Sequence, residues 1–352
     1  MALGATETDL GQQQVGAFAD RVRAIRTALH EVVVGQDEVI DQLLVCALTG
    51  SHALIVGVPG LAKTLMVKAL AAAFRWKYGR IQFTPDLMPS DITGTEVIQE
   101  DRRSGGRELR FLKGPIFGNV ILADEINRTP PKTQAALLEA MQEYQITAGG
   151  QRHPLTQPFF VLATQNPIEH EGTYPLPEAQ LDRFMFNTFV DYPEEDEEFD
   201  IVRRTTADIT TTITPTLTGP RILELQKIVR RVPAADHVVR YAMKLVRLTR
   251  PNKPAAPQFI RDYVSWGAGP RASQCLVLGA KARAVLHGRF HAGLDDVRAV
   301  AFPVLRHRIV TNFNAEAEGV KSDEIVCRLI ETVGENGGSE ETLPPVFRKE
   351  RK

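Results

Sequence analysis

Two pairs of polar residues in this chain have the types and the spacing to handle a phosphate chain. Lys63-Thr64 follows a Gly/Pro-rich turn, Gly57 to Ala62, and Asp124-Glu125 stands about sixty residues further on. A lysine after a glycine turn can reach the oxygens of a polyphosphate, and the threonine hydroxyl can bind Mg²⁺. Asp124 would hold the Mg²⁺ shell and Glu125 would polarise an attacking water. The two pairs therefore point to hydrolysis of a magnesium-bound polyphosphate.

The flanking residues predict the strand, loop and helix that a phosphate loop needs. The apolar run Ala53 to Val56 predicts a buried strand, and Leu65 to Phe74 has helical spacing. Gly57 and Gly60 let backbone N–H groups turn inward, and the dipole of the following helix adds positive potential. Ala62 stands where the general pattern has a second glycine, and we expect helical dihedral angles there, which a methyl group tolerates. The alternative is a tight strand-to-helix turn whose Lys-Thr pair has no function.

Two further strands are expected to bring polar groups to the same edge of a parallel sheet. The run Val120 to Ala123 ends at the acid pair, and Phe159 to Thr164 ends shortly before Asn166. The carboxyl ends of parallel strands are where α/β sheets bind ligands. If the strands are neighbours, Asn166 emerges beside Asp124 and can orient a water; otherwise it only starts a turn before proline. Upstream, Val34 to Gln36 could form a floor for a purine base.

Two arginines are candidates for contact with phosphate. Arg183 lies near the end of Glu178 to Phe184, a segment with helical character that precedes a short strand. Paired with Asp182 it would be structural, whereas facing the γ-phosphate of a neighbouring copy it would be an arginine finger. Arg271 follows Gly269-Pro270 at a helix start, where it is placed to face a nucleotide.

The composition is that of a globular chain with no dominant charge. Its 352 residues are 43% hydrophobic and 24% charged, with a formal net charge of -1. No overall field favours nucleic acid or an anionic membrane. Cys46, Cys275 and Cys327 lack metal-like spacing and are expected to be buried thiols. The first residues do not resemble a signal peptide and no apolar run of about 18 residues occurs, so the cytoplasm is expected.

A change of composition divides the chain into an α/β part and a helical part. The Thr-rich stretch before position 219 predicts a linker, and the periods beyond it are helical. Two hairpins are predicted, one from the extended runs Thr95 to Gln99 and Glu108 to Leu112, the other from Gln145 to Pro158. The arginines of the first hairpin either form a solvated surface or grip a partner. The expected divisions are a flexible start (1–17), a nucleotide-binding domain (18–204) with its hairpin (95–112), the linker (205–219), a helical lid (220–335) and a flexible tail (336–352).

Five motifs, taken in order, closely resemble the MoxR family of AAA+ ATPases. They are Val34-Gly35-Gln36, the loop Gly57 to Thr64, Leu122 to Arg128, Ala163 to Pro167, and Leu176 to Phe184. The alanine before the lysine, unusual among P-loop proteins, is what this family carries. The resemblance covers roughly residues 18 to 310. It implies an α/β fold with a P-loop AAA+ core, a parallel sheet with helices on both faces, and a C-terminal all-helical lid domain.

The resemblance also implies a role for each matching position. Lys63 and Thr64 are similar to the Walker A pair, and Asp124 and Glu125 to the Walker B pair. Asn166 resembles the sensor 1 residue, Arg183 the finger that acts on the neighbouring subunit, and Arg271 the sensor 2 arginine of the lid. The implied ATP contacts are Val34, Gly35, Gln36, Gly57, Val58, Pro59, Gly60, Leu61, Ala62, Lys63, Thr64, Leu65, Asp124 and Arg271, and the implied Mg²⁺ ligands are Thr64 and Asp124.

By the same resemblance, the chain would hydrolyse ATP in a ring, expected to be a homohexamer because a finger in trans needs a neighbour. Its work would be chaperone-like remodelling of a client protein or insertion of a metal cofactor into a metalloenzyme. A separate protein with a von Willebrand factor A domain often takes part. The hairpins at 95–112 and 145–158 resemble the helix-2 insert and the pre-sensor hairpin that line the pore of such rings.

Two other functions stay open at this point. One is a nucleotide-gated scaffold that binds ATP but hydrolyses it slowly, against which the intact Glu125 and Arg183 argue. The other is a nucleic-acid motor of the helix-2-insert group. Such a motor needs basic pore hairpins, and only the cluster from Arg102 to Arg110 qualifies. Contact with nucleic acid is therefore not expected. Contact with a membrane is not expected either, because the charge is balanced and no long apolar run occurs.

Overall fold

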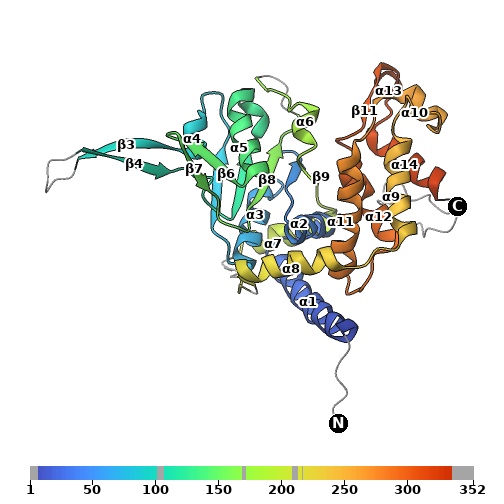
Figure 1. Ribbon diagram of the computed structural model, residues 1–352, viewed down its shortest axis with the longest axis horizontal. Coiled ribbons are helices and arrows are strands. Elements are labelled where there is room, and N and C mark those ends of the chain that lie inside the picture. Colours follow the sequence, from blue (N-terminus) through green and yellow to red (C-terminus); the bar gives the residue numbers. More distant parts are fainter. Residues whose placement is uncertain (1–6, 101–106, 169–171, 208–212, 216, 335–352) are drawn as a thin grey trace, which may run out of the picture.

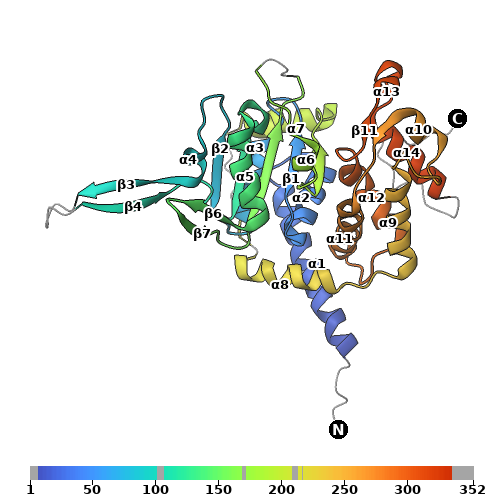
Figure 2. The same cartoon turned by 45° about the horizontal axis from the view of Figure 1, so that its top comes forward.

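The chain folds into an α/β part and a mainly helical part that lie side by side (Figure 1). The computed structural model describes residues 7–100, 107–168, 172–207, 213–215 and 217–334. A two-stranded hairpin projects from the α/β part, on the side away from the helical part (Figures 1 and 2). Within these described residues, no helix has the length and apolarity needed to cross a membrane.

A five-stranded parallel sheet forms the centre of the α/β part. Its order is β2-β5-β8-β1-β9, and every neighbouring pair runs parallel. The carboxyl ends of all five strands therefore meet at one edge. The strands are β1 (Ala53–Val56), β2 (Tyr78–Gln82), β5 (Val120–Asp124), β8 (Phe160–Gln165) and β9 (Phe186–Phe189).

Helices cover both faces of this sheet, as the sequence predicted. Successive strand residues point to opposite faces, so Leu54 and Ile121 pack in one core with α5, while Ile55 and Leu122 pack in the other with α2 and α3. Burial on both faces explains why these strands are continuous apolar runs. The helices of this part are α1 (Glu7–His30), α2 (Asp37–Thr49), α3 (Lys63–Ala73), α4 (Pro89–Thr93), α5 (Pro131–Glu143), α6 (Glu178–Leu181) and α7 (Glu195–Thr205), with a 3₁₀ turn, η1 (Ile126–Arg128).

Two elements differ from the sequence expectation. Helix α1 begins at Glu7, inside the stretch expected to be flexible; the good helix formers there, among them Gln12 to Gln14, slightly outnumber the weaker ones, which include two glycines. Helix α6 ends at Leu181, so Arg183 lies in the turn that leads to β9 and not in a helix. The three cysteines are free, and Cys46 and Cys327 are buried, while Cys275 is half-buried.

Both predicted hairpins are present. Strands β3 (Gly94–Glu100) and β4 (Arg107–Lys113) pair antiparallel, as do β6 (Gln145–Ala148) and β7 (Gln151–Pro154). The turn expected at Ser104 to Gly106 lies outside the described residues. Ile98 and Leu109 face each other across β3 and β4 and are 68% and 70% exposed. The projecting hairpin therefore presents apolar side chains to solvent.

The C-terminal part is a helical lid with one small exception to the expected all-helical fold. Short strands β10 (Val264–Trp266) and β11 (Val310–Thr311) form an antiparallel pair, which suits their β-branched and aromatic residues. Residues 336–352, expected to be a tail, lie outside the described residues. The lid helices are α8 (Gly219–Arg231), α9 (Asp236–Leu248), α10 (Gln258–Tyr263), α11 (Pro270–Leu286), α12 (Leu294–Leu305), α13 (Phe313–Glu318) and α14 (Ser322–Val333).

Candidate active site

The phosphate loop connects the carboxyl end of β1 to the first residue of α3. A Cβ atom on Gly57 would lie 2.7 Å from the carbonyl oxygen of Val190, so a side chain does not fit there. The Lys63 ammonium donates to the carbonyl oxygens of Gly57 (2.5 Å) and Val58 (2.7 Å) and so lies over the loop. Burial lowers the pKa of Lys63, and the nearby acid pair opposes that shift. The lysine is thus held where phosphate oxygens would enter the loop.

Ala62 does not have the helical dihedral angles that the sequence analysis expected. Its φ of 54° and ψ of 16° are left-handed, and it is the residue that caps the start of α3. For a residue with a Cβ, this conformation costs about 1–2 kcal/mol relative to the right-handed region. The expectation was wrong because the backbone must change direction between the loop and the helix, and Ala62 is the residue whose left-handed conformation makes that change. Strain of this kind concentrates at functional sites.

The acid pair stands at the carboxyl end of β5 and is fixed by the neighbouring strand β8. The Thr164 hydroxyl donates to Oδ1 of Asp124 at 2.7 Å and accepts the backbone N–H of Glu125 at 2.9 Å. Thr164 is 1% exposed, so these bonds are shielded from water. One buried hydroxyl therefore orients both acids.

A second set of side chains engages the same two carboxylates from β2 and η1. Arg80 donates to Oδ2 of Asp124 at 2.7 Å, and that hydrogen bond raises the pKa of the arginine. Gln82 donates to Oε2 of Glu125 at 2.9 Å, and Arg128 forms an ion pair with the same oxygen at 3.3 Å. Donors from β2 and η1 therefore hold both carboxylates in place together with Thr164.

Asn166 emerges beside the acid pair, as predicted, because β5 and β8 are neighbours in the sheet. The residue is 5% exposed, and its Oδ1 accepts the backbone N–H of Ile168 at 3.3 Å. Its Nδ2 is buried and has no hydrogen-bond partner among the described residues. A buried amide without a partner is costly, so this donor fits a water or phosphate oxygen that completes the site.

The proposed floor for the base lies at the same edge of the sheet. Gly35 and Gln36 are both left-handed, with φ of 65° and 59°. Gln36 Nε2 donates to the carbonyl oxygen of Asp191, which follows β9, at 2.9 Å. The segment Val34 to Gln36 is thereby attached beside the strand that borders the phosphate loop.

Arg183 and Arg271 lie at the edge of the sheet opposite the phosphate loop. Both line a pocket together with Gly50, Ser51 and His52, which precede β1, whereas the phosphate loop follows β1. Arg183 donates to the carbonyl oxygen of Leu138 at 2.7 Å. The site of one chain therefore brings together Lys63, Asp124, Glu125 and Asn166 but neither arginine.

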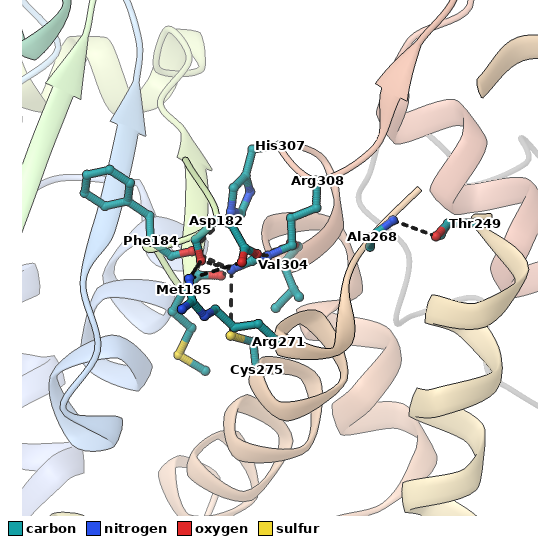
Figure 3. A network of polar contacts seen from close by, with 10 residues as sticks. All are labelled: Asp182, Phe184, Met185, Thr249, Ala268, Arg271, Cys275, Val304, His307 and Arg308. Carbon is teal, nitrogen blue, oxygen red and sulfur yellow. Dashed lines mark hydrogen bonds and ion pairs between the residues drawn. The ribbon is translucent and has the colours of Figure 1, made fainter. Parts of the chain in front are cut away.

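The lid arginine Arg271 contacts an acid of its own chain. Arg271 pairs with Oδ2 of Asp182 at 3.1 Å, and the buried Arg308 pairs with Oδ1 of the same residue at 2.7 Å (Figure 3). The pairing that the sequence analysis considered for Arg183 is thus made by Arg271 and Arg308.

Comparison with known proteins agrees with this architecture. A model described as ATPase family associated with various cellular activities (AAA) matches residues 52–186, and an AAA lid domain model matches residues 258–329. The chain is 41% identical over 324 residues to the chaperone MoxR1 of Mycobacterium tuberculosis, a match that covers 90% of this chain and 83% of that protein. It is 40% identical over 306 residues to the uncharacterized protein YeaC of Bacillus subtilis, covering 87% and 92% respectively.

The chain belongs to the MoxR family of AAA+ ATPases. A solved structure of a candidate ATPase from Cytophaga hutchinsonii agrees with this MoxR fold, with a TM-score of 0.85 at 39% identity. That match covers 93% of this chain and 98% of the other. The AAA family binds nucleotides, so the loop, acid pair and asparagine described above form the candidate nucleotide site of a MoxR protein.

The residues at this MoxR site also suit a magnesium ion. The Thr64 hydroxyl, half-buried beside the loop, and the Asp124 carboxylate are hard oxygen donors of the kind that Mg²⁺ prefers. Thr164, Arg80 and Gln82 also hold the acids in place, and the motifs in the sequence did not predict them. Thr164 lies in the motif Ala163 to Pro167 and directly follows Ala163, which pairs with Ala123 on the neighbouring strand. This strand register places Thr164 next to Asp124, and it is the signal from which the contact could have been predicted.

Proposed function

We propose that this MoxR-family chain hydrolyses Mg²⁺-ATP at sites shared between the copies of a ring. The observation that carries the proposal of hydrolysis is the position of Asn166. It directly follows β8, the strand next to the one that ends at the acid pair, and its buried Nδ2 has no partner among the described residues. A base and a water-orienting donor on adjacent strand ends are what attack on a terminal phosphate requires.

Each residue of the chain has one task in this reaction. Lys63 and the backbone of the phosphate loop bind and orient the β- and γ-phosphates. Asn166 donates to the attacking water, and Glu125 accepts the proton that the water loses. Mg²⁺, held by Thr64 and Asp124, supplies positive charge to the phosphate oxygens when it is bound.

The arginine finger comes from a second copy in this proposal. Arg183 stands at the edge of the sheet opposite the phosphate loop of its own chain. In a head-to-tail arrangement, one copy's loop edge faces the next copy's Arg183 edge, and such heterologous contacts form a ring when the rotation between copies closes. Arg183 would then neutralise charge on the neighbour's γ-phosphate, and Arg271, which lines the same pocket, would assist it. A homohexamer is the proposed assembly.

The work of the ring is proposed to be chaperone-like. The relative named chaperone MoxR1 is 41% identical, and the projecting β3–β4 hairpin exposes Ile98 and Leu109, as a surface that grips apolar client segments would. Activation of a client or insertion of a metal cofactor into a metalloenzyme is the expected outcome. A separate protein with a von Willebrand factor A domain is the proposed partner, and the cytoplasm is the proposed location.

The first test replaces the base by its amide. Glu125→Gln should reduce turnover by at least about a thousandfold while ATP still binds, because the amide cannot accept the proton. The exposed Glu139→Gln on α5 is a matched control that should keep normal turnover. Normal turnover in Glu125→Gln would contradict the assignment.

The same variant can identify the partner. Because Glu125→Gln should bind ATP without hydrolysing it, the variant should retain clients that dissociate from the wild type. Mass spectrometry of the proteins recovered in a pull-down with ATP would identify them. Recovery of a metalloenzyme or a von Willebrand-type protein supports the chaperone proposal. Recovery of nucleic acid, lost at high salt, would replace it with a nucleic-acid motor.

A further inference from the structure

A cationic pocket lies at the junction of the sheet and the lid. It has a volume of about 820 Å³ and is lined from α8 by Arg230, from α11 by Lys281, and by the two arginines Arg183 and Arg271. Asp182 is the acid of this lining, and it is already paired with Arg271 and Arg308. No described residue forms an ion pair with Arg183, Arg230 or Lys281. The pocket therefore carries uncompensated positive charge.

The wall of this pocket is apolar. Met141, Met185, Val277 and Leu278 contribute to it, together with Met243, which is 45% exposed. An exposed methionine at a pocket edge is an adaptable contact for another apolar side chain. The occupant that fits best combines negative charge with exposed apolar residues.

One segment of the same chain has both properties. Between Asp191 and Asp200 there are seven acids and no lysine or arginine. Tyr192, Phe199 and Val202 in and beside this segment are 70%, 66% and 54% exposed. Acids in the first turn of α7 suit the helix dipole, but the dipole does not explain why large apolar side chains stand next to them in water.

This acidic segment borders the nucleotide site. Gln36, on the proposed floor for the base, donates to the carbonyl oxygen of Asp191. A Cβ atom on Gly35 would lie 2.5 Å from the Glu197 carboxyl group, so the first turn of α7 packs against that floor. Because Arg183 lines the pocket, a neighbour whose Arg183 reached this nucleotide would bring its pocket toward the side of the site that α7 borders.

We propose that the cationic pocket of one copy receives the acidic segment, residues 191–202, of the next copy. The proposal rests on the ring proposed above and deepens it by naming the surfaces that join its subunits. Opposite charges would speed and orient docking, while the apolar side chains of both surfaces would supply the buried area. Filling the pocket would also place Arg183 and Arg271 at the neighbour's phosphates.

Two charge-reversed variants test this pairing in a Glu125→Gln background with ATP. The first is Arg230→Glu with Lys281→Glu, which reverses the pocket. The second replaces four exposed acids by lysine, which leaves the segment with three acids and four lysines and so reverses its charge; the four are Glu194, Glu195, Asp196 and Glu198. Each alone should need at least about tenfold more protein to assemble, because like charges then face each other. Lys253→Glu, an exposed lid residue that does not line the pocket, is the control and should assemble normally.

Mixing the two variants gives the decisive result. In an alternating ring, every pocket faces a segment of opposite charge, so a 1:1 mixture should assemble although neither variant does alone. Sedimentation velocity measures the assembly, and a fluorescent ATP analogue checks that each variant still folds and binds nucleotide. Assembly of each variant alone at the parental concentration would overturn the pairing, as would failure of the mixture while nucleotide binding is intact. If the parent itself does not assemble, the ring proposal fails instead.

Discussion

The Asp182 carboxylate accepts a hydrogen bond from Nε of Arg308 at 2.7 Å, and the next residue in the chain is Arg183. The Arg308 side chain is 2% exposed, and it also donates to the carbonyl oxygens of Phe184 (2.7 Å) and Met185 (3.1 Å) (Figure 3). A lid residue therefore holds the backbone on both sides of the proposed finger. Movement of the lid would move Arg183 with it.

Asp182→Asn should consequently lower turnover more than it lowers ATP binding. The change weakens two charged contacts that position Arg183, and a loss of about 1.4 kcal/mol at the transition state is a tenfold loss of kcat. The Kd for ATP should change less than about twofold, because the phosphate loop lies at the other edge of the sheet. Asp323→Asn, which breaks the lid ion pair with Arg306 at 3.0 Å, is the matched control. Equal kcat values for the two variants would refute the positioning role.

Thr164→Val should reduce turnover about tenfold to a hundredfold. Valine keeps the shape but removes the hydroxyl that bonds to Asp124 and to the N–H of Glu125, which leaves a buried donor unsatisfied at a cost of about 1–3 kcal/mol. Thr164→Ser retains the hydroxyl and should recover most of the activity. Steady-state kinetics and urea unfolding of both variants make the measurement. If serine and valine are equally impaired, the hydroxyl is not the group that matters.

Ala62→Gly should stabilise the protein, because Ala62 has a φ of 54° that glycine adopts without strain. We expect a rise of about 1 kcal/mol in the free energy of unfolding. The control is Ala72→Gly, at an exposed position inside α3, which should lower that free energy by about 1 kcal/mol. Loss of stability in both variants would show that the left-handed conformation is not strained.

Stability should fall as the pH is lowered below neutrality. Burial lowers the pKa of His52 to about 4, whereas the unfolded side chain has a pKa of about 6.5. Between these values the unfolded state binds more protons, so the contribution is complete above about pH 6.5 and is lost toward pH 4. At pH 5.5 the loss should be about 1 kcal/mol relative to pH 7.5. His52→Gln should remove this part of the pH dependence, and an unchanged dependence in urea titrations would disprove it.

The sequence predicted best what local patterns determine. Ala53–Val56 was expected as a strand and is one, because buried parallel strands must be apolar runs. The neighbourhood of Asn166 and Asp124 followed from the rule that parallel strand ends share an edge. These are the features on which the nucleotide site depends.

Features set by contacts between distant residues could not be predicted in this way. Arg271 and Asp182 are 89 residues apart in the sequence, and no rule of sequence spacing favours this ion pair over a contact between Arg271 and a nucleotide. The left-handed Ala62 depends on how the loop closes between a fixed strand and a fixed helix. The role of the Thr164 hydroxyl was not predicted because threonine in a buried strand is ordinarily explained by the packing of its β-branched side chain.

The most direct test of a site shared between copies is a mixing experiment. Glu125→Gln supplies an intact Arg183 but no base, and Arg183→Ala supplies an intact base but no finger. Each alone should hydrolyse ATP at a small fraction of the wild-type rate. In a 1:1 mixture, about a quarter of the interfaces would join an intact base to an intact finger, so turnover should rise to about a quarter of wild type. If sedimentation shows that the copies mix and turnover still does not rise, Arg183 does not act across the interface and the account is wrong.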